Sequence, residues 1–212
     1  MAAACACAVP GVRAQEPEPF ALRVHLRIDR VIPFRANAAD LRDETEQLWR
    51  PYGVHIEWAD ACDGDPGVRG LCVEAALAQR IHEPDRPNGA IVLGLASAEP
   101  AGPAGARSIL VSVDATIRVL ALRRTSLSSV AAMVPGRELT RALGRVLAHE
   151  IGHVLLDMWF HDETGLMRAT YDPHELANRN RVPFRLTEGA RARLRSRLCG
   201  LPGNSRPSSE VK

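Results

Sequence analysis

What the chain lacks already excludes several classes of protein. Lysine is almost absent, with Lys212 the only one, and the formal net charge is only +2. No global field therefore draws the protein to nucleic acid, and we expect no nucleic-acid partner. No apolar run approaches the length of a membrane-spanning helix, so we expect no membrane insertion. The sequence contains no C-x-x-C pair, so we expect no zinc site built from cysteines. At 212 residues, without an internal repeat, the chain suits one domain, and we expect a monomer.

The two ends of the chain differ in composition from the stretch between them. Residues 1–19 begin with small apolar residues and finish rich in Pro and Glu, which resembles a secretory signal peptide without its positive n-region. We interpret them as a signal peptide or flexible N-terminus, which predicts a secreted or periplasmic protein. Residues 201–212 have the composition of a disordered tail. Residues 20–200 then form the single folded domain.

The five cysteines fit export. Cys5 and Cys7 would leave with the signal peptide, which leaves three alternative pairings among Cys62, Cys72 and Cys199. A turn-rich loop separates Cys62 from Cys72, and a disulfide there would contribute about 2–3 kcal/mol by chain entropy. The sequence leaves open which of the three pairs forms.

The spacing of apolar residues predicts the secondary structure. Apolar and polar residues alternate over residues 21–28, which predicts a strand, and His25 falls on its polar side. His55 has the same position in the next predicted strand, so we expect both histidines to be exposed and not to bind metal. Residues 73–80 fit a short helix or an edge strand. The other expected elements are strands at residues 54–58, 90–95 and 108–113, and helices at residues 38–49, 114–122 (with Asp114 as N-cap), 137–156 and 187–199.

The segment His149–His153, with the sequence HEIGH, carries the chemistry. Side chains four residues apart lie one above the other on a helix, so both imidazoles can reach one metal ion. Glu150 lies beside the first of them, where its carboxylate can take a proton from water at the metal. The apolar positions Leu139, Leu143 and Val146 lie on the same stripe of the helix, which places the histidines on its buried side. The alternative is a pair of exposed histidines on an ordinary helix.

The third metal ligand has to come from downstream residues. A catalytic zinc site keeps three protein ligands and one open position, whereas a structural site is closed by four, often cysteines, and no cysteine lies near His149. His161 is the best candidate, because it follows the expected end of the helix and its ring can fold back. Asp157 shares the helix face, but its short side chain points at the next turn. His174 and Glu175 are alternatives if the chain loops back.

The segment His149–Met167 resembles the metzincin clan of zinc metallopeptidases, in particular small secreted bacterial proteins with a similar motif. The resemblance implies that His149, His153 and His161 bind Zn²⁺. It implies that Glu150 is the catalytic general base. Met167, in Gly-Leu-Met, would be the Met-turn residue that packs beneath the metal.

Three positions depart from the metzincin pattern. His161 follows His149 by twelve residues, whereas metzincins place the third histidine ten residues after the first. Leu156 stands where metzincins have a glycine, so the chain must leave the helix by another route. Tyr171 lies four residues past Met167, whereas metzincins that use a tyrosine near the metal place it two past. By the resemblance, Tyr171 is a candidate transition-state stabiliser.

The implied fold is α+β and zincin-like, with a twisted mixed β-sheet packed on an active-site helix and a short C-terminal helical part. Residues 108–113 would be the edge strand that binds extended substrate by backbone pairing. The implied function is that of a zinc-dependent metalloendopeptidase acting on a peptide or protein substrate. The alternative is a non-catalytic zinc-binding protein or a decayed peptidase used for interaction, against which the intact Glu150 argues. A third interpretation is a structural fold without metal.

Overall fold

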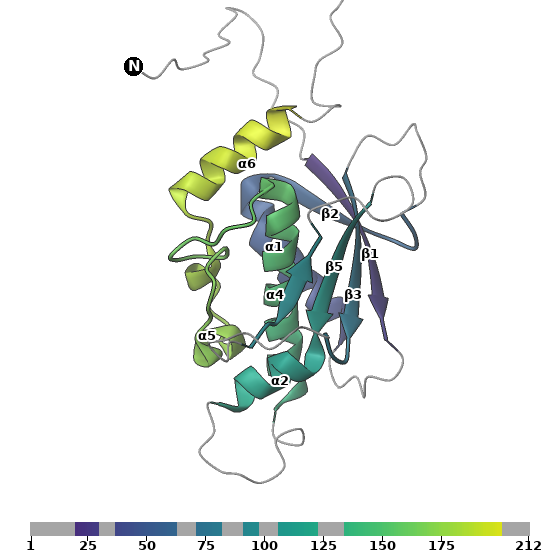
Figure 1. Cartoon of the computed structure of the whole chain (residues 1–212), viewed down its shortest axis with the longest axis vertical. Coiled ribbons are helices and arrows are strands. Elements are labelled where there is room, and N and C mark those ends of the chain that lie inside the picture. Colours follow the sequence, from purple (N-terminus) through teal and green to yellow (C-terminus); the bar gives the residue numbers. More distant parts are fainter. Residues whose placement is uncertain are drawn as a thin grey trace, which may run out of the picture.

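A five-stranded sheet with helices on one of its faces makes up the described part of the chain (Figure 1). The computed structural model describes residues 20–29, 37–62, 71–81, 91–97, 106–122 and 134–200. In chain order the elements are β1 (Phe20–Ile28), α1 (Ala38–Trp49), η1 (Arg50–Tyr52), β2 (Val54–Ala59), β3 (Leu71–Ala78), β4 (Gly94–Ala96), β5 (Arg107–Ser112), α2 (Val113–Ala121), α4 (Gly136–Leu156), α5 (Pro173–Ala177), η3 (Val182–Phe184) and α6 (Glu188–Gly200).

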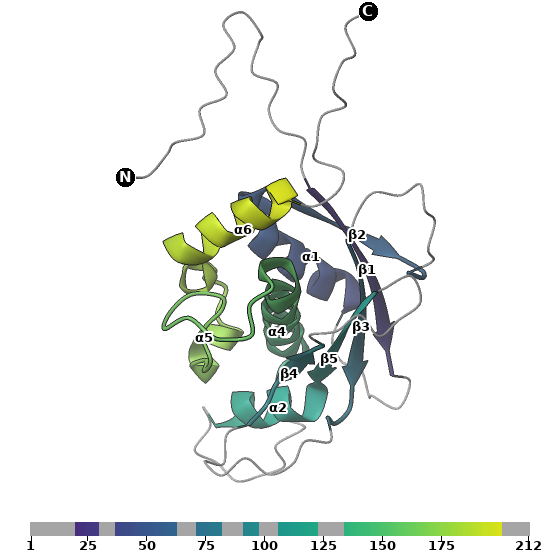
Figure 2. The same cartoon turned by 45° about the horizontal axis from the view of Figure 1, so that its top comes forward.

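The sheet is mixed, with the strand order β2-β1-β3-β5-β4. The first four strands in this order pair in parallel, and β4 pairs antiparallel with β5. Alternation along β1 buries Leu22, Val24 and Leu26, while His25 points to the other face and is half-buried. Helices α1 and α4 pack on the buried face, as Figure 2 shows from a second direction. His55 on β2 is exposed, as expected.

Three strands differ from the predictions made from the sequence. Residues 73–80 were expected to form a helix or an edge strand, but β3 lies inside the sheet between β1 and β5. It pairs in parallel with both β1 and β5, and Val73, Ala75 and Leu77 are all buried on one face. The expected buried strand at residues 90–95 is the short, half-buried edge strand β4. Strand β5 is therefore internal, and the predicted edge strand at residues 108–113 is wrong: the edge beside α4 is β4.

The predicted helix at residues 38–49 has the observed bounds of α1, whose N-cap Asn37 accepts a hydrogen bond from the Ala39 amide. The expected N-cap of α2 is wrong by two positions. Ser112 is the cap, and its hydroxyl accepts from the Ala115 amide at 3.2 Å. The carboxylate of Asp114 instead forms an ion pair with Arg80.

Helix α4 is the central element, and it is buried almost throughout from Leu139 to Leu156. A fully buried arginine, Arg145, anchors it one turn before the histidines. Its guanidinium donates to the Glu44 carboxylate of α1 at 2.8 Å and to carbonyl oxygens at the end of α5 and in the following loop, including that of Asn180 at 3.2 Å. Because these partners satisfy the buried charge, Arg145 ties α1 and the α5 segment to α4.

Helix α4 ends where the chain turns toward the candidate site. Asp157 adopts the left-handed conformation, with φ 49° and ψ 51°, and the Met158 amide donates to the His153 carbonyl. Arg193 of α6 donates to the Leu156 carbonyl at 2.8 Å and to the Asp157 carbonyl at 3.1 Å. These bonds satisfy carbonyls that a helix end leaves unpaired, and they hold α6 against the end of α4.

Of the three pairings that the sequence left open, the structure contains the disulfide Cys62–Cys72, with the two Cα atoms 5.8 Å apart. Cys199 is free and exposed. None of the described helices is long and apolar enough to cross a membrane. The expected signal peptide, residues 1–19, and the expected disordered tail, residues 201–212, lie outside the described residues.

Candidate metal centre

Two histidines lie on one face of α4, at the spacing that the helical period requires. The Nε2 atoms of His149 and His153 are 3.0 Å apart, and their rings meet at 82°. Both side chains are buried, with exposed fractions of 5% and 6%, and Glu150 between them is 5% exposed. Nearly dry surroundings of this kind strengthen any charge interaction inside the site.

The third histidine arrives from the loop after the helix. The ring centroid of His161 lies 5.3 Å from that of His149 and 5.1 Å from that of His153. Among the residues that the structure describes, these histidines form the one group that could hold a metal, with one ligand atom from each lying within 4.8 Å of the others. The left-handed turn at Asp157 takes the place of a glycine, because aspartate tolerates this conformation better than most residues.

Hydrogen bonds fix which ring nitrogens of the buried pair face the centre. Nδ1 of His149 lies 2.7 Å from the Leu166 carbonyl oxygen, and Nδ1 of His153 bonds to the Met158 carbonyl oxygen. A carbonyl only accepts, so each Nδ1 carries the proton and each Nε2 presents a lone pair. Two lone pairs facing each other at 3.0 Å repel unless a cation lies between them. The separation is close to the roughly 3.3 Å expected between two nitrogens of a tetrahedral zinc site with bonds of about 2.0–2.1 Å, so the donor set fits zinc.

Burial holds both helix histidines neutral. It lowers the pKa of His149 from 6.5 to about 3, and the nearby His153 lowers it further within that total. Burial also lowers the pKa of His153, against a raising contribution from the hydrogen bond to the Met158 carbonyl. A metal ion binds the neutral imidazole, so both rings are ready to bind without first losing a proton.

The metal-free protein is therefore expected to lose stability as the pH falls below about 6.5. Between that pH and about 3, His149 binds a proton in the unfolded chain but not in the folded one, so the free energy of unfolding decreases as the pH drops. At pH 5 this amounts to about 2 kcal/mol for His149 alone. Urea denaturation of chelator-treated protein at pH 7.5 and pH 5 measures it.

Two histidine variants provide the controls for this pH dependence. His149→Asn should reduce it, because asparagine does not titrate in this range, and His153 would supply the pH dependence that remains. His55→Asn should leave it unchanged, because His55 is exposed on β2. Equal pH dependence in the wild type and in His149→Asn would contradict the assignment of a buried, neutral His149.

Glu150 lies against the edge strand β4. A Cβ added at Gly94 would lie only 2.6 Å from the Glu150 Oε1 atom, so the carboxylate occupies the space that a side chain at position 94 would fill. Gly152, two residues further along α4 and so on nearly the opposite side of the helix, approaches Met167, and a Cβ at this glycine would overlap the Met167 sulfur. Met167 is fully buried and packs directly against α4 at this glycine. The structure thus places the predicted Met-turn residue under the helix that carries the histidines.

The hydroxyl of Tyr171 lies on the Nδ1 side of the His149 ring, away from the facing Nε2 atoms. It is 2.6 Å from His149 Nδ1, and it donates a hydrogen bond to the Leu166 carbonyl oxygen that Nδ1 also contacts. The ring stacks on Phe184 with centroids 5.6 Å apart. Burial, and after it the charge of Glu150, raises the pKa of Tyr171 well above its usual value, so the hydroxyl stays protonated. The transition-state role inferred from the resemblance stays a prediction.

The contact with Nδ1 predicts that Tyr171→Phe lowers zinc affinity by about tenfold, the smaller end of the range for groups that orient a metal ligand. The expected loss is small because the Leu166 carbonyl still holds the ring. A competition titration with a coloured zinc chelator measures it, and turnover per bound zinc should stay near the wild-type value. A loss of turnover with unchanged zinc affinity would instead favour the transition-state role.

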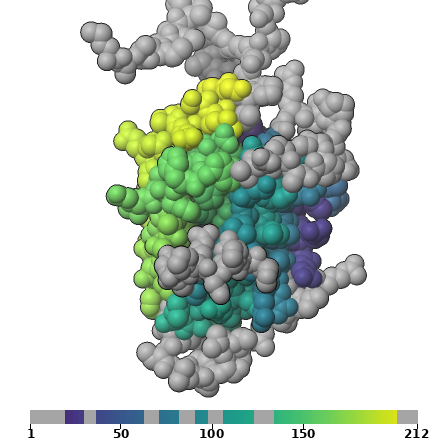
Figure 3. Space-filling model, in the orientation of Figure 1, coloured from purple at the N-terminus to yellow at the C-terminus, as the bar shows by residue number. Residues whose placement is uncertain are grey.

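The alternative third ligands do not reach the centre. Asp157 forms ion pairs with Arg107 at 3.9 Å and Arg197 at 3.5 Å. His174 is exposed on α5, and Glu175 forms an ion pair with Arg168. Figure 3 shows the segment after α4, in green, at the surface between α6 in yellow and the teal strands.

Two neighbours of the site were missed from the sequence. The Trp159 ring lies nearly parallel to the His153 ring, with centroids 5.9 Å apart and planes 6° apart, and its side chain remains partly exposed. No sequence pattern indicated this contact. Gly94 did carry a signal, because a glycine inside an apolar strand often marks a close approach of another group.

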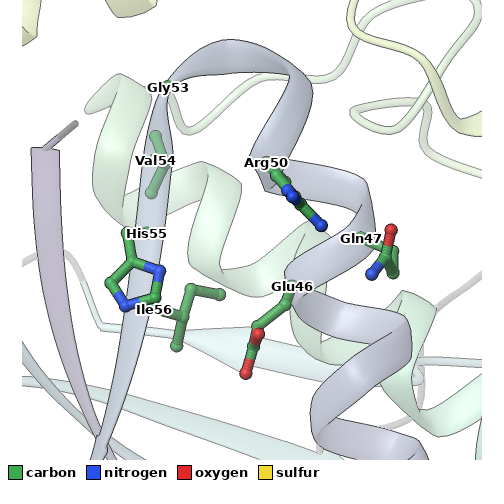
Figure 4. Close-up of a pocket in the computed structure, with 7 residues that line it drawn as sticks. All are labelled: Glu46, Gln47, Arg50, Gly53, Val54, His55 and Ile56. Carbon is green, nitrogen blue, oxygen red and sulfur yellow. The ribbon is translucent and has the colours of Figure 1, made fainter.

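A separate cavity of about 340 Å³ lies between α1 and β2 (Figure 4). Glu46, Arg50 and His55 contribute its charged and titratable groups. Glu46 already accepts a hydrogen bond from the Trp58 indole. None of the three histidines of the candidate centre lines this cavity.

Comparisons with known proteins find a likeness among solved structures. The archaemetzincin of Methanopyrus kandleri, a crystal structure at 1.5 Å resolution, is 16% identical in sequence, with a TM-score of 0.49 over 88% of this chain and 99% of that chain. No family model matches the chain, and neither does any curated protein. With a likeness this low, the chemistry of the candidate centre rests on its own residues.

Proposed function

We propose that the protein is a zinc-dependent metalloendopeptidase of zincin-like, metzincin-type architecture, which hydrolyses peptide bonds in peptide or protein substrates. The observation that carries the proposal is the convergence of three imidazoles, with ligand atoms within 4.8 Å of one another, beside a buried carboxylate. A site that only stores zinc does not need that carboxylate.

The proposed zinc ligands are His149, His153 and His161. Three protein ligands are the number typical of catalytic zinc sites, which keep a fourth position for water or substrate. Zinc held in this way would supply Lewis acidity, which lowers the pKa of water to about 7 and polarises a peptide carbonyl.

Glu150 is the proposed proton carrier. Its carboxylate would accept a proton from the attacking water and pass it to the nitrogen of the leaving amine, as a general base and then a general acid. Because Glu150 is almost fully buried, few water molecules compete for its oxygen atoms. Met167 forms an apolar floor beneath α4.

Strand β4 is the proposed binding edge for extended substrate. Its pairing with β5 uses backbone groups of Leu93 and Ser97, which bond to Ser112 and Ser108. In an antiparallel ladder, every second residue directs its backbone N–H and C=O toward the paired strand, and the residues between them direct theirs away from it. The backbone groups of Gly94 and Ala96 therefore face away from β5. An extended peptide can pair there by β-augmentation.

Export is part of the proposal. The Cys62–Cys72 disulfide supports a secreted or periplasmic protein, because disulfides persist in oxidising compartments.

The function is tested by measuring zinc content and proteolysis on the same preparation. Purified protein is expected to hold one zinc ion per chain and to degrade unfolded casein. A chelator should abolish degradation, and added zinc should restore it. Stoichiometric zinc without any hydrolysis would favour a non-catalytic zinc-binding protein, and protein that takes up no zinc would remove both interpretations.

A further inference from the structure

Gly94 and Glu150 come closer than any side chain at position 94 would permit. A Cβ built on Gly94 would lie 2.6 Å from Oε1, 2.7 Å from Cγ and 2.8 Å from Cδ of Glu150. Contacts below 3.0 Å do not occur for real Cβ atoms, so the glutamate packs on the bare α-carbon of the edge strand. β4 and α4 lie in contact along this stretch, and Figure 2 labels both.

The glycine is needed here for space and not for its backbone freedom. Gly94 does not have a positive φ, unlike Gly53 and Gly165. An alanine could therefore adopt the same strand conformation. The atoms in its way belong to the flexible side chain of Glu150 and not to a backbone, so alanine would be accommodated by displacement of the carboxylate.

We propose that Gly94 is a positioning residue for Glu150: the absence of a side chain on β4 sets where the carboxylate of the proposed general base lies. The catalytic consequence of this inference rests on the proposed function. Its structural half, that a side chain at position 94 would displace the Glu150 carboxylate, does not. It also links two parts of the site, because the same residue directs backbone groups toward the proposed substrate edge.

Gly94→Ala is expected to lower kcat by about 100-fold, the loss that accompanies a misplacement of about 1 Å at a reacting group. KM should change little, because alanine keeps the backbone amide and carbonyl that would pair with substrate. The zinc dissociation constant and the melting temperature should also stay close to the wild-type values, because the histidines and the core are untouched.

Gly189→Ala is the matched control. A Cβ at this position on α6 meets only the Thr187 hydroxyl, at 4.0 Å, so the variant should retain wild-type kcat. In a Glu150→Gln background, Gly94→Ala should cause no further loss, because its effect passes through that carboxylate. A second loss of about 100-fold in the double variant would overturn the proposal.

A crystal structure of metal-free Gly94→Ala tests the structural half without any assay of hydrolysis. The Glu150 carboxylate should move away from β4 while the strand stays in place. If the carboxylate keeps its position and the strand moves instead, the inference is wrong. If the wild type has no peptidase activity but the carboxylate moves as expected, only the proposed function is lost.

Discussion

Replacing Glu150 with glutamine is expected to lower the turnover number for peptide hydrolysis by about 10²- to 10⁴-fold, the contribution of a positioned general base. Glutamine has nearly the same shape, so it can fill the space against Gly94. Its amide cannot accept a proton near neutral pH, so the proposed proton transfer from water to the leaving amine would be lost. Steady-state kinetics on an unfolded protein or a quenched peptide substrate measures the effect.

Zinc content separates this loss from a damaged site. Glu150→Gln should bind zinc as the wild type does, because the three histidines are unchanged. Glu188→Gln is the matched control, since Glu188 is exposed in the first turn of α6 and should be silent. Full turnover in zinc-loaded Glu150→Gln would remove the general-base assignment.

His161→Ala is expected to weaken zinc binding at least about 100-fold, as much as His153→Ala does. Groups that merely orient a ligand already account for 10- to 100-fold in metal affinity, so loss of a ligand exceeds that range. Because His161 is exposed on a loop, its removal should leave the fold intact, which circular dichroism verifies. Competition with a chelator of known affinity gives the dissociation constants.

A histidine outside the cluster provides the control for this experiment. His174 lies exposed on α5, so His174→Ala should bind zinc as tightly as the wild type. If His161→Ala retains wild-type affinity while His174→Ala loses it, the third ligand has been assigned to the wrong residue.

The local periodicity of apolar residues was enough to predict the helices and strands that bury one apolar face. Apolar residues recur at steps of three and four over residues 38–49 and 137–156, and the bounds of α1 and α4 match these ranges to within one residue. β1 and β2 alternate strictly, and they too appear where expected. The place of β3 in the sheet could not be read in the same way, because it depends on partners far along the chain.

In the candidate site, too, local periodicity predicts some of the relations between residues and not others. The relation of His149, Glu150 and His153 follows from the period of one helix, and His161 was selected by chemistry and by its position after the helix end. The contacts of Tyr171 with His149 Nδ1 and of Gly94 with Glu150 are tertiary. They join segments whose approach no local pattern encodes.

The left-handed aspartate at the end of α4 has a consequence for recognising related sites in genomes. It allows an alternative exit from the helix, with a third histidine two positions later than the metzincin spacing and no glycine at position 156. A search template with a fixed interval and an obligatory glycine would pass over such a chain. Templates that permit a residue tolerant of positive φ, and a variable interval after it, would retrieve it.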